Sequence, residues 1–327
     1  MAAPMTPPAA APAFLARAGW SDARIEPLAG DASFRRYFRV FDSARRAVLM
    51  DAPPPNEDPR SFLAIARHLT ALGFAAPEIL AEDTARGLVL LEDFGDARMR
   101  EAIDADPSIE DATYREAVAL LAALHRHPPA DLPPYSRAEL HREAGLLAQW
   151  FCPAVGLDVD GAGYRVAWDA AFDRIGDAAS VTVLRDYHAE NIMLRVGREG
   201  QDRLGLLDFQ DALVGHPAYD LVSMLQDARR DVAPDVEATM LELYRRLSRP
   251  EDGFDTAYAI LGAQRNAKII GIFTRLWKRD GKPRYLELLP RVWGYLERDL
   301  AHPALAEVSE WFTAQVPTDR RLALKSA

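Results

Sequence analysis

Three oxygen-bearing side chains in the middle of the chain have the spacing of a phosphoryl-transfer site. Asp186 lies five residues before Asn191, and Asp208 follows the short apolar run Leu204–Leu207. Carboxylate and amide oxygens suit Mg²⁺ when nucleotide phosphates and water complete its coordination. Phosphoryl transfer also needs a group that orients or deprotonates the attacking hydroxyl. We therefore expect Asp186 to be the catalytic residue, and Asn191 and Asp208 to hold the metal ion.

Two short strands must bring Asn191 and Asp208 together. The apolar runs Ile192–Val196 and Leu204–Leu207 flank a turn-prone stretch over residues 197–202. Antiparallel pairing about that turn sets Asn191 beside Asp208. Each of the three residues alone also fits a turn or a strand end, and only their combined spacing indicates a kinase-like site. A metal site made of Asp186, His188 and Asp208, which would suggest a hydrolase, is the alternative.

The rest of the chain divides into a strand-rich part and a helical part. Residues 34–50 have the pattern of a β-hairpin with its turn at residues 43–46, and residues 79–82 and 88–91 are typical of two more strands. Between them a helix opens at Asp58-Pro59 and ends at Gly73. Beyond residue 105 helical periodicity dominates, with a capping box at Ser136–Glu139. We expect an α+β fold: a small antiparallel β lobe over residues 1–95, with a flexible tail at 1–13, and a larger helical lobe over residues 96–327.

Composition narrows the class of protein. The 327 residues are 49% hydrophobic and 27% charged, as in a globular protein. A net charge of −10 argues against a nonspecific nucleic-acid binder. No apolar run approaches the roughly 20 residues of a membrane helix, and the Ala/Pro-rich N-terminus lacks the pattern of a signal peptide. We expect a cytoplasmic protein with a small-molecule substrate and no nucleic-acid or membrane partner; the sequence identifies no protein partner.

Several segments resemble a known family. Asp186, Asn191 and Asp208 are similar to the D-x-x-x-x-N and D-F-G pattern of protein kinases. The segments 207–212 and 215–221 resemble motifs of the aminoglycoside phosphotransferase, or choline-kinase-like, superfamily. The segments 30–39, 50–54 and 271–276 are similar to the bacterial anomeric N-acetylmuramate/N-acetylglucosamine kinases of cell-wall recycling. The resemblance covers about residues 14–305 and implies a bilobal protein-kinase-like fold, ATP and Mg²⁺, and an amino sugar phosphorylated on its C1 hydroxyl.

The resemblance also implies nucleotide contacts in the first lobe. Kinase-like enzymes place a lysine on the third strand, but here that strand ends at Met50 and the first lysine in the chain is Lys268. Arg35 and Arg36 are the candidates to bind the phosphates, because a guanidinium is a planar group with five hydrogen-bond donors. The alternative is that these arginines lie on the solvent-exposed face of a hairpin. The expected nucleotide contacts are Ser33, Phe34, Arg35, Arg36 and Met50, with Glu92, Asp93 and Phe94 meeting adenine between the lobes.

The acceptor is expected in the helical lobe. Arg265 lies in a polar run of an otherwise apolar helix and could meet the lactyl carboxylate of N-acetylmuramate, with a solvated helix surface as the alternative. The other expected substrate contacts are His188, Glu190, Asp211 and Trp150. Asp220 is expected to cap a helix. Two other functions stay open: a kinase of another small alcohol, such as an aminoglycoside or choline, and a nucleotide-binding pseudokinase, which the missing strand lysine allows.

Overall fold

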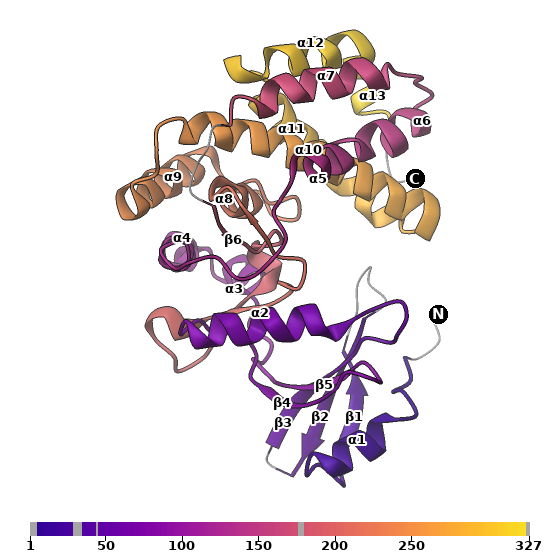
Figure 1. Ribbon diagram of the computed structural model, residues 1–327, viewed down its shortest axis with the longest axis vertical. Coiled ribbons are helices and arrows are strands. Elements are labelled where there is room, and N and C mark those ends of the chain that lie inside the picture. The colour runs from indigo at the N-terminus through magenta and orange to yellow at the C-terminus, as the bar shows by residue number, and fades with distance from the viewer. Residues whose placement is uncertain (1–4, 29–34, 44, 176–179, 325–327) are drawn as a thin grey trace. The chain divides into compact units, whose positions relative to one another are not determined.

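The chain forms two compact units in a computed structural model, which describes residues 5–28, 35–43, 45–175 and 180–324 (Figure 1). Unit 1 comprises Met1–Pro107 and Glu190–Asp211, and unit 2 comprises Ser108–Ala189 and Ala212–Ala327. The expected boundary at residue 95 therefore falls inside unit 1. A later segment, which carries Asn191 and Asp208, also belongs to unit 1.

Unit 1 is built on an antiparallel sheet with the strand order β1-β2-β3-β5-β4. The strands are β1 (Arg24–Pro27), β2 (Arg36–Asp42), β3 (Arg45–Asp51), β4 (Ile79–Asp83) and β5 (Leu88–Glu92). The predicted hairpin is β2–β3, in which Arg36 pairs with Asp51. Helix α1 (Ala11–Arg17) packs on the sheet beside Phe38 and Leu49, and Ala11 is fully buried. Residues 11–13 are thus helical, which corrects the expectation of a flexible tail there.

Helix α2 (Pro59–Ala71) begins and ends where the sequence predicts. The carboxylate of Asp58 accepts a hydrogen bond of 3.0 Å from the backbone N–H of Arg60. The chain leaves the helix at Gly73, whose φ of 84° favours glycine. On its inner face, the ring of Phe62 stacks on that of Phe209 with centroids 5.0 Å apart.

A second small hairpin completes unit 1. Strands β7 (Ile192–Leu194) and β8 (Leu204–Leu206) pair antiparallel, with Ile192 opposite Leu206. The 3₁₀ turns η3 (Ala189–Asn191) and η4 (Gly200–Arg203) precede these strands, and helix α3 (Met99–Ala105) packs beside β7. The backbone N–H of Leu206 donates to the carbonyl of Ala75 at 2.8 Å, which joins the hairpin to the segment that follows α2.

Unit 2 is mostly helical and is organised around the long helix α10 (Phe254–Asp280), which packs against α5, α8 and α11 (Figure 1). Ser136 accepts a hydrogen bond of 3.2 Å from the backbone N–H of Glu139, which confirms that it caps the start of α5. The backbone N–H of Ser136 donates to the carbonyl of Pro134 and the Glu139 carboxylate binds Arg142, so the reciprocal bond of the predicted capping box is replaced. Strands β6 (Val181–Val183) and β9 (Leu213–Gly215) pair antiparallel. The other elements are η1 (Pro107–Ile109), α4 (Glu110–Leu124), α5 (Arg137–Ala144), the π-helical turn η2 (Leu147–Phe151), α6 (Cys152–Ala154), α7 (Gly161–Phe172), α8 (Ala218–Leu225), α9 (Pro234–Ser248), η5 (Pro283–Leu288), α11 (Leu289–Leu300), η6 (Pro303–Leu305), α12 (Ala306–Gln315) and α13 (Thr318–Arg321).

The architecture confirms the predicted α+β class, with a small antiparallel sheet and a larger helical part. Within the described residues, no helix combines the length and the apolar composition that crossing a membrane requires.

Candidate active site

Asn191 and Asp208 lie at the same end of the β7–β8 hairpin. Asn191 directly precedes β7, and Asp208 follows β8 by two residues. The backbone N–H of Leu207 donates to the carbonyl of Asn191 at 2.9 Å, so the pairing continues past the ends of the strands. Asn191 Nδ2 lies 3.4 Å from Asp208 Oδ2. The antiparallel pairing that the sequence predicts therefore brings these two side chains together.

Asp208 is held in an uncommon backbone conformation. Its φ of 57° lies in the left-handed region, which residues other than glycine adopt mainly where the surroundings enforce it. Directly after it, the ring of Phe209 is fully buried and stacked on Phe62. Asp208 Oδ1 accepts a hydrogen bond of 2.9 Å from Gln210 Nε2. Packing of Phe209 thus fixes the backbone at the position from which the Asp208 side chain projects.

The Asn191–Asp208 pair fits a nucleotide-bound cation better than a metal enclosed by protein ligands. Rotation of the Asn191 amide exchanges its oxygen and nitrogen, so both residues can present oxygen to the same ion. Across the described residues, no group of three or more His, Cys, Asp or Glu side chains could hold a metal ion. Mg²⁺ at this pair would therefore take its remaining ligands from phosphates and water.

Asp186 belongs to unit 2, in the loop that follows β6. Burial alone would raise the pKa of its half-buried carboxyl group. Positive charges, chiefly those of Lys268, Arg265 and Arg185, together with His188, outweigh burial and hold the pKa of Asp186 below its ordinary value. The carboxylate is therefore ionised at neutral pH.

Asp220 fixes the backbone of the Asp186 loop. Its fully buried carboxylate accepts hydrogen bonds from the backbone N–H groups of Leu184, at 2.6 Å, and Arg185, at 2.8 Å. Burial raises the pKa of Asp220 to about 7. The expectation that Asp220 caps a helix is wrong, because α8 has no side-chain cap and the carboxylate bonds to the Asp186 loop instead.

A buried ionic cluster around Glu143 was missed by the sequence reasoning. The Glu143 carboxylate is 1% exposed and lies 2.8 Å from Lys268 Nζ. It also pairs with Arg185 and accepts a hydrogen bond from the hydroxyl of Tyr135. Burial would raise the pKa of Glu143, but Lys268 and Arg185 outweigh it and lower that pKa. The one signal in the sequence was Lys268 itself, an isolated lysine in a largely apolar helix.

The expected acceptor contacts fall in both units. In unit 2, His188 is buried, and burial lowers its pKa to about 4. Arg265 is also buried and donates to Ser223 Oγ at 2.8 Å. Trp150 is half-buried on the η2 turn. In unit 1, Glu190 pairs with Arg100, and Asp211 Oδ2 lies 3.4 Å from Gln210 Nε2.

The expected nucleotide contacts lie in unit 1, and Ser33 and Phe34 fall outside the described residues. Each candidate phosphate-binding arginine faces a carboxylate: Arg35 Nε is 3.4 Å from Glu57, and Arg36 Nε is 2.9 Å from Asp51. Met50 is fully buried within the sheet. At the end of β5, Glu92 pairs with Arg195 at 2.7 Å, Asp93 pairs with Arg39 at 2.8 Å, and Phe94 packs under the Arg195 guanidinium.

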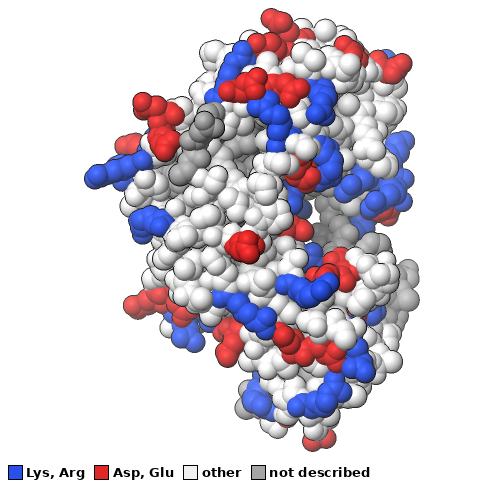
Figure 2. All heavy atoms as spheres, in the orientation of Figure 1, with Lys and Arg blue, Asp and Glu red and all other residues white. Residues whose placement is uncertain are grey.

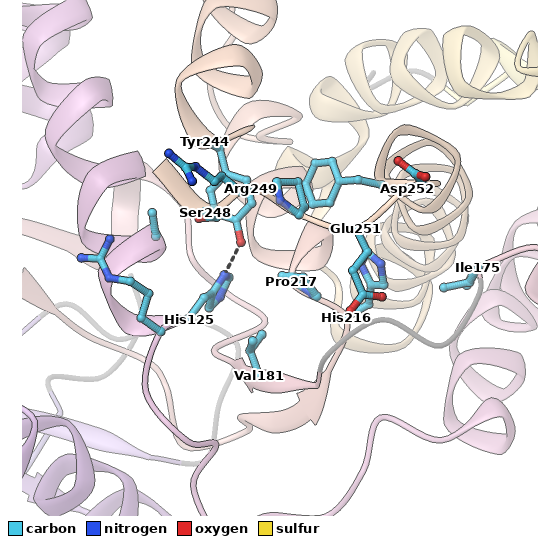
Figure 3. Close-up of a pocket in the computed structure, with 14 residues that line it drawn as sticks. His125, Ile175, Val181, His216, Pro217, Tyr244, Ser248, Arg249, Glu251 and Asp252 are labelled. Atoms are coloured by element: carbon cyan, nitrogen blue, oxygen red, sulfur yellow. Dashed lines mark hydrogen bonds between the residues drawn. The ribbon is translucent and has the colours of Figure 1, made fainter. Parts of the chain in front are cut away.

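A separate cavity of about 200 Å³ lies in unit 2 (Figure 3). His125 Nδ1 and the hydroxyl of Tyr244 point toward one another at its wall, 2.7 Å apart. Burial lowers the pKa of His125 to about 3 and that of His216 to about 4, so both rings are neutral at physiological pH. The described residues that line this cavity include none of the predicted site residues.

The sequence matches known phosphotransferases over most of its length. The model of the phosphotransferase enzyme family matches residues 24–258. The N-acetylmuramate/N-acetylglucosamine kinase of Caulobacter vibrioides is 38% identical, and the alignment covers 96% of this chain and 98% of that protein. A protein of the same name from Pseudomonas aeruginosa is 36% identical, with 89% of each chain covered.

Solved structures share the fold at much lower identity. A choline/ethanolamine kinase family protein from Mesorhizobium loti matches with a TM-score of 0.64 and 15% identity, covering 92% of this chain and 98% of that one. The choline kinase LicA from Streptococcus pneumoniae matches with a TM-score of 0.61 and 14% identity, covering 86% and 93%. These likenesses establish the fold alone. The family model and the sequence relatives show, as the motif resemblance implied, that this chain belongs to the phosphotransferase enzyme family.

Proposed function

We propose that this protein is a cytoplasmic, ATP- and Mg²⁺-dependent kinase that phosphorylates the C1 hydroxyl of N-acetylmuramate and N-acetylglucosamine, as a step of cell-wall recycling. The observation that carries the proposal is the identity of 34–38% to four curated relatives that bear this name. The Asn191–Asp208 pair and the ionised Asp186 support it with the side chains that the reaction needs.

Asp186 is the proposed catalytic residue. The C1 oxygen bonds to the γ-phosphorus of ATP while the bond from that phosphorus to the oxygen bridging to the β-phosphate breaks, and ADP leaves. The proton of the C1 hydroxyl passes to the Asp186 carboxylate. The anomeric hydroxyl is the most acidic hydroxyl of a sugar, so a carboxylate with a low pKa suffices as the base. Asp220 orients this base by holding the backbone of its loop.

Asn191 and Asp208 are the proposed ligands of Mg²⁺, which would neutralise the charge that develops on the transferred phosphoryl group. For the phosphates we propose Arg35 and Arg36. Because these guanidinium groups face Glu57 and Asp51, nucleotide binding must exchange a carboxylate partner for a phosphate oxygen. The adenine contacts at Glu92–Phe94 and the acceptor contacts at His188, Glu190, Asp211 and Trp150 stay predictions.

The test is the product formed from ATP, Mg²⁺ and a panel of acceptors that includes both amino sugars, choline and an aminoglycoside. We expect phosphorus NMR to show a phosphomonoester at C1 of the amino sugars. A phosphoester at C6, or turnover of choline or the aminoglycoside alone, would contradict the proposal.

Variants then separate the roles of the side chains. We expect Asp186→Asn to lower kcat by roughly 10²- to 10⁴-fold with little change in ATP affinity. Asp208→Asn should instead raise the Mg²⁺ concentration needed for half-maximal rate. Asp202→Asn is the control, because that carboxylate lies on the turn of the same hairpin and pairs with Arg195.

A further inference from the structure

Arg275, near the C-terminal end of α10, is half-buried without an anionic partner. Its Nε atom is buried, and the guanidinium makes no hydrogen bond or ion pair with any residue that the structure describes. Burying a charged group without a partner is unfavourable. A site that keeps such a group is therefore suited to an anion that arrives with a ligand.

The charged side chains around Arg275 leave an excess of positive charge at this position. Burial lowers the pKa of Arg275, and the neighbouring Arg279 and Arg142 lower it further, while Asp280 acts in the opposite direction. These neighbours already have partners: Arg279 Nε lies 2.6 Å from Asp280, and Arg142 Nε lies 2.7 Å from Glu139. Figure 2 shows basic side chains gathered over this end of α10. The local excess of positive charge thus remains at Arg275.

The segment from α5 through η2, which carries the aromatic residue Trp150, packs along α10. The segment from α5 through η2 advances in step with α10 through three successive contacts. They are Gln264 with the carbonyl of Leu140 at 3.2 Å, Lys268 with Glu143 at 2.8 Å, and Gly271 against the backbone of Leu146. The η2 turn, which carries Trp150, continues this segment and also packs against α10. An indole face is an apolar surface on which a pyranose ring can pack.

Arg275 also lies on the same side of α10 as Lys268, two helical turns further along. Seven residues of α-helix span about 10 Å. The charge of Lys268 acts on Asp186, the proposed base. An acceptor whose reacting hydroxyl is at Asp186 can therefore extend along α10 toward Arg275, over a length comparable to a sugar with a short acidic side chain.

We propose that Arg275, with Trp150 on the η2 turn that packs against the same helix, is the specificity-determining site that binds the lactyl carboxylate of N-acetylmuramate. This inference rests on the proposed function and extends it to the choice between the two sugars. N-acetylglucosamine lacks the carboxylate and gains nothing from this guanidinium. Arg265, the residue expected from the sequence to bind the carboxylate, is buried and donates to Ser223.

The experiment compares the two sugars as substrates of Arg275→Gln, in the full-length protein. We expect kcat/KM for N-acetylmuramate to fall roughly 10- to 100-fold, mainly through KM, because a charge-assisted bidentate hydrogen bond is lost. The value for N-acetylglucosamine should change by less than about 2-fold, as expected for an independent surface substitution. Arg275→Lys keeps the charge but loses the planar, bidentate guanidinium. Its kcat/KM for N-acetylmuramate should therefore lie between those of the wild type and Arg275→Gln.

Arg279→Gln is the matched control, because this arginine is exposed, lies one turn further along α10 and is paired with Asp280. This substitution should leave kcat/KM unchanged for both sugars. An equal loss on both sugars in Arg275→Gln would show a structural role only, and no loss on either would place the carboxylate elsewhere; both results overturn the inference.

Calorimetric titration of each sugar without ATP separates this inference from the proposed function. If the wild type binds both sugars but phosphorylates neither, the proposed function fails. The inference then stands or falls on whether Arg275→Gln weakens binding of N-acetylmuramate alone, and wild-type protein that does not bind N-acetylmuramate overturns both.

Discussion

The carboxylate of Asp220 accepts a hydrogen bond of 2.8 Å from the backbone N–H of Arg185. Arg185 has a φ of 70°, a conformation that an arginine keeps only when its surroundings enforce it. The residue that follows it is Asp186. A buried side chain from α8 therefore determines the direction in which the chain presents the proposed base.

Replacing Asp220 with alanine should lower both stability and turnover. The substitution leaves two buried N–H groups without an acceptor, which costs about 2–4 kcal/mol of unfolding free energy. Asp220→Asn keeps a carbonyl oxygen as acceptor and should retain more of both properties. Urea unfolding and kcat measure the two effects, with the exposed Asp22→Ala as the control. Unchanged stability in Asp220→Ala would show that these hydrogen bonds do not hold the loop.

The positive charge of Lys268 should set the pH at which kcat/KM falls on the acid side of its pH profile, the acid limb. The groups that act on Asp186 are Lys268, His188, Arg265 and Arg185, and Asp186 in turn acts on Asp220. Lys268→Met removes a positive charge, so the pKa of Asp186 rises and activity is lost at a higher pH as the solution is acidified. Lys268→Arg keeps the charge and should leave the limb near its wild-type position.

The measurement for Lys268 is kcat/KM against pH for the wild type and both variants. A purely structural role would lower the plateau without moving the acid limb. An acid limb that stays in place in Lys268→Met would therefore count against an electrostatic role.

Gly271 should tolerate no side chain. A Cβ atom at this position would lie 2.3 Å from the carbonyl carbon of Leu146, and a backbone atom cannot rotate away as a side chain can. We expect Gly271→Ala to lower the unfolding free energy by about 1–3 kcal/mol. Gly294→Ala in α11 is the matched control, because nothing lies within 4 Å of its Cβ position. Helix propensity predicts that this control gains up to about 1 kcal/mol.

Urea unfolding of these two glycine variants measures whether close packing or helix propensity dominates the free energy of unfolding. If Gly271→Ala is as stable as Gly294→Ala, then α10 and the backbone at Leu146 are not as closely packed as the structure indicates.

Stability should fall as the pH rises from about 7 to 8, toward the folded pKa of the more perturbed of two buried carboxyl groups. Burial raises the pKa of Asp299 to about 8 and that of Asp220 to about 7, both above the ordinary value of 3.8. In this window the folded protein holds protons on these groups that the unfolded chain has lost, so unfolding free energy decreases with pH. The buried histidines His125, His188 and His216 act in the opposite direction, because the unfolded chain binds protons at these groups near their ordinary pKa of 6.5, but most of that effect lies below pH 7.

Asp299→Asn isolates the contribution of one of these groups. Its slope over the same window should be shallower than that of the wild type by at most about 1.4 kcal/mol per pH unit. The asparagine can still accept hydrogen bonds of the kind that Gln226 and Asn266 donate to Asp299. Urea midpoints at several pH values provide the measurement, and equal slopes would contradict the assignment.

Local sequence signals predicted much of the fold. The cap at Asp58, the glycine after α2 and the turn between β2 and β3 act over a few residues, so their patterns can be read directly from the sequence. The pairing of β7 with β8 was also predictable, because a turn-prone stretch between two apolar runs fixes the register. That register brings Asn191 to Asp208.

Contacts between distant segments left little trace in the sequence. Glu143 and Lys268 are separated by four strands and several helices, and nothing in either local pattern indicates that they pair. Asp220 sits at a helix start, where a cap is the usual role, and only the tertiary fold directs its carboxylate to the Asp186 loop. For the same reason, the sequence could not show that Arg275 lacks a partner.

The hairpin that carries Asn191 and Asp208 is interleaved with a segment encoded more than a hundred residues earlier. Its strand β8 bonds to Ala75, its Phe209 stacks on Phe62, and its Arg195 pairs with Glu92. A gene fragment that stops at Pro107 would keep Ala75, Phe62 and Glu92 but lack the hairpin that contacts all three. Neither unit can therefore be expressed as one uninterrupted piece, and recombination that exchanges the N-terminal sheet between relatives must carry residues 190–211 with it.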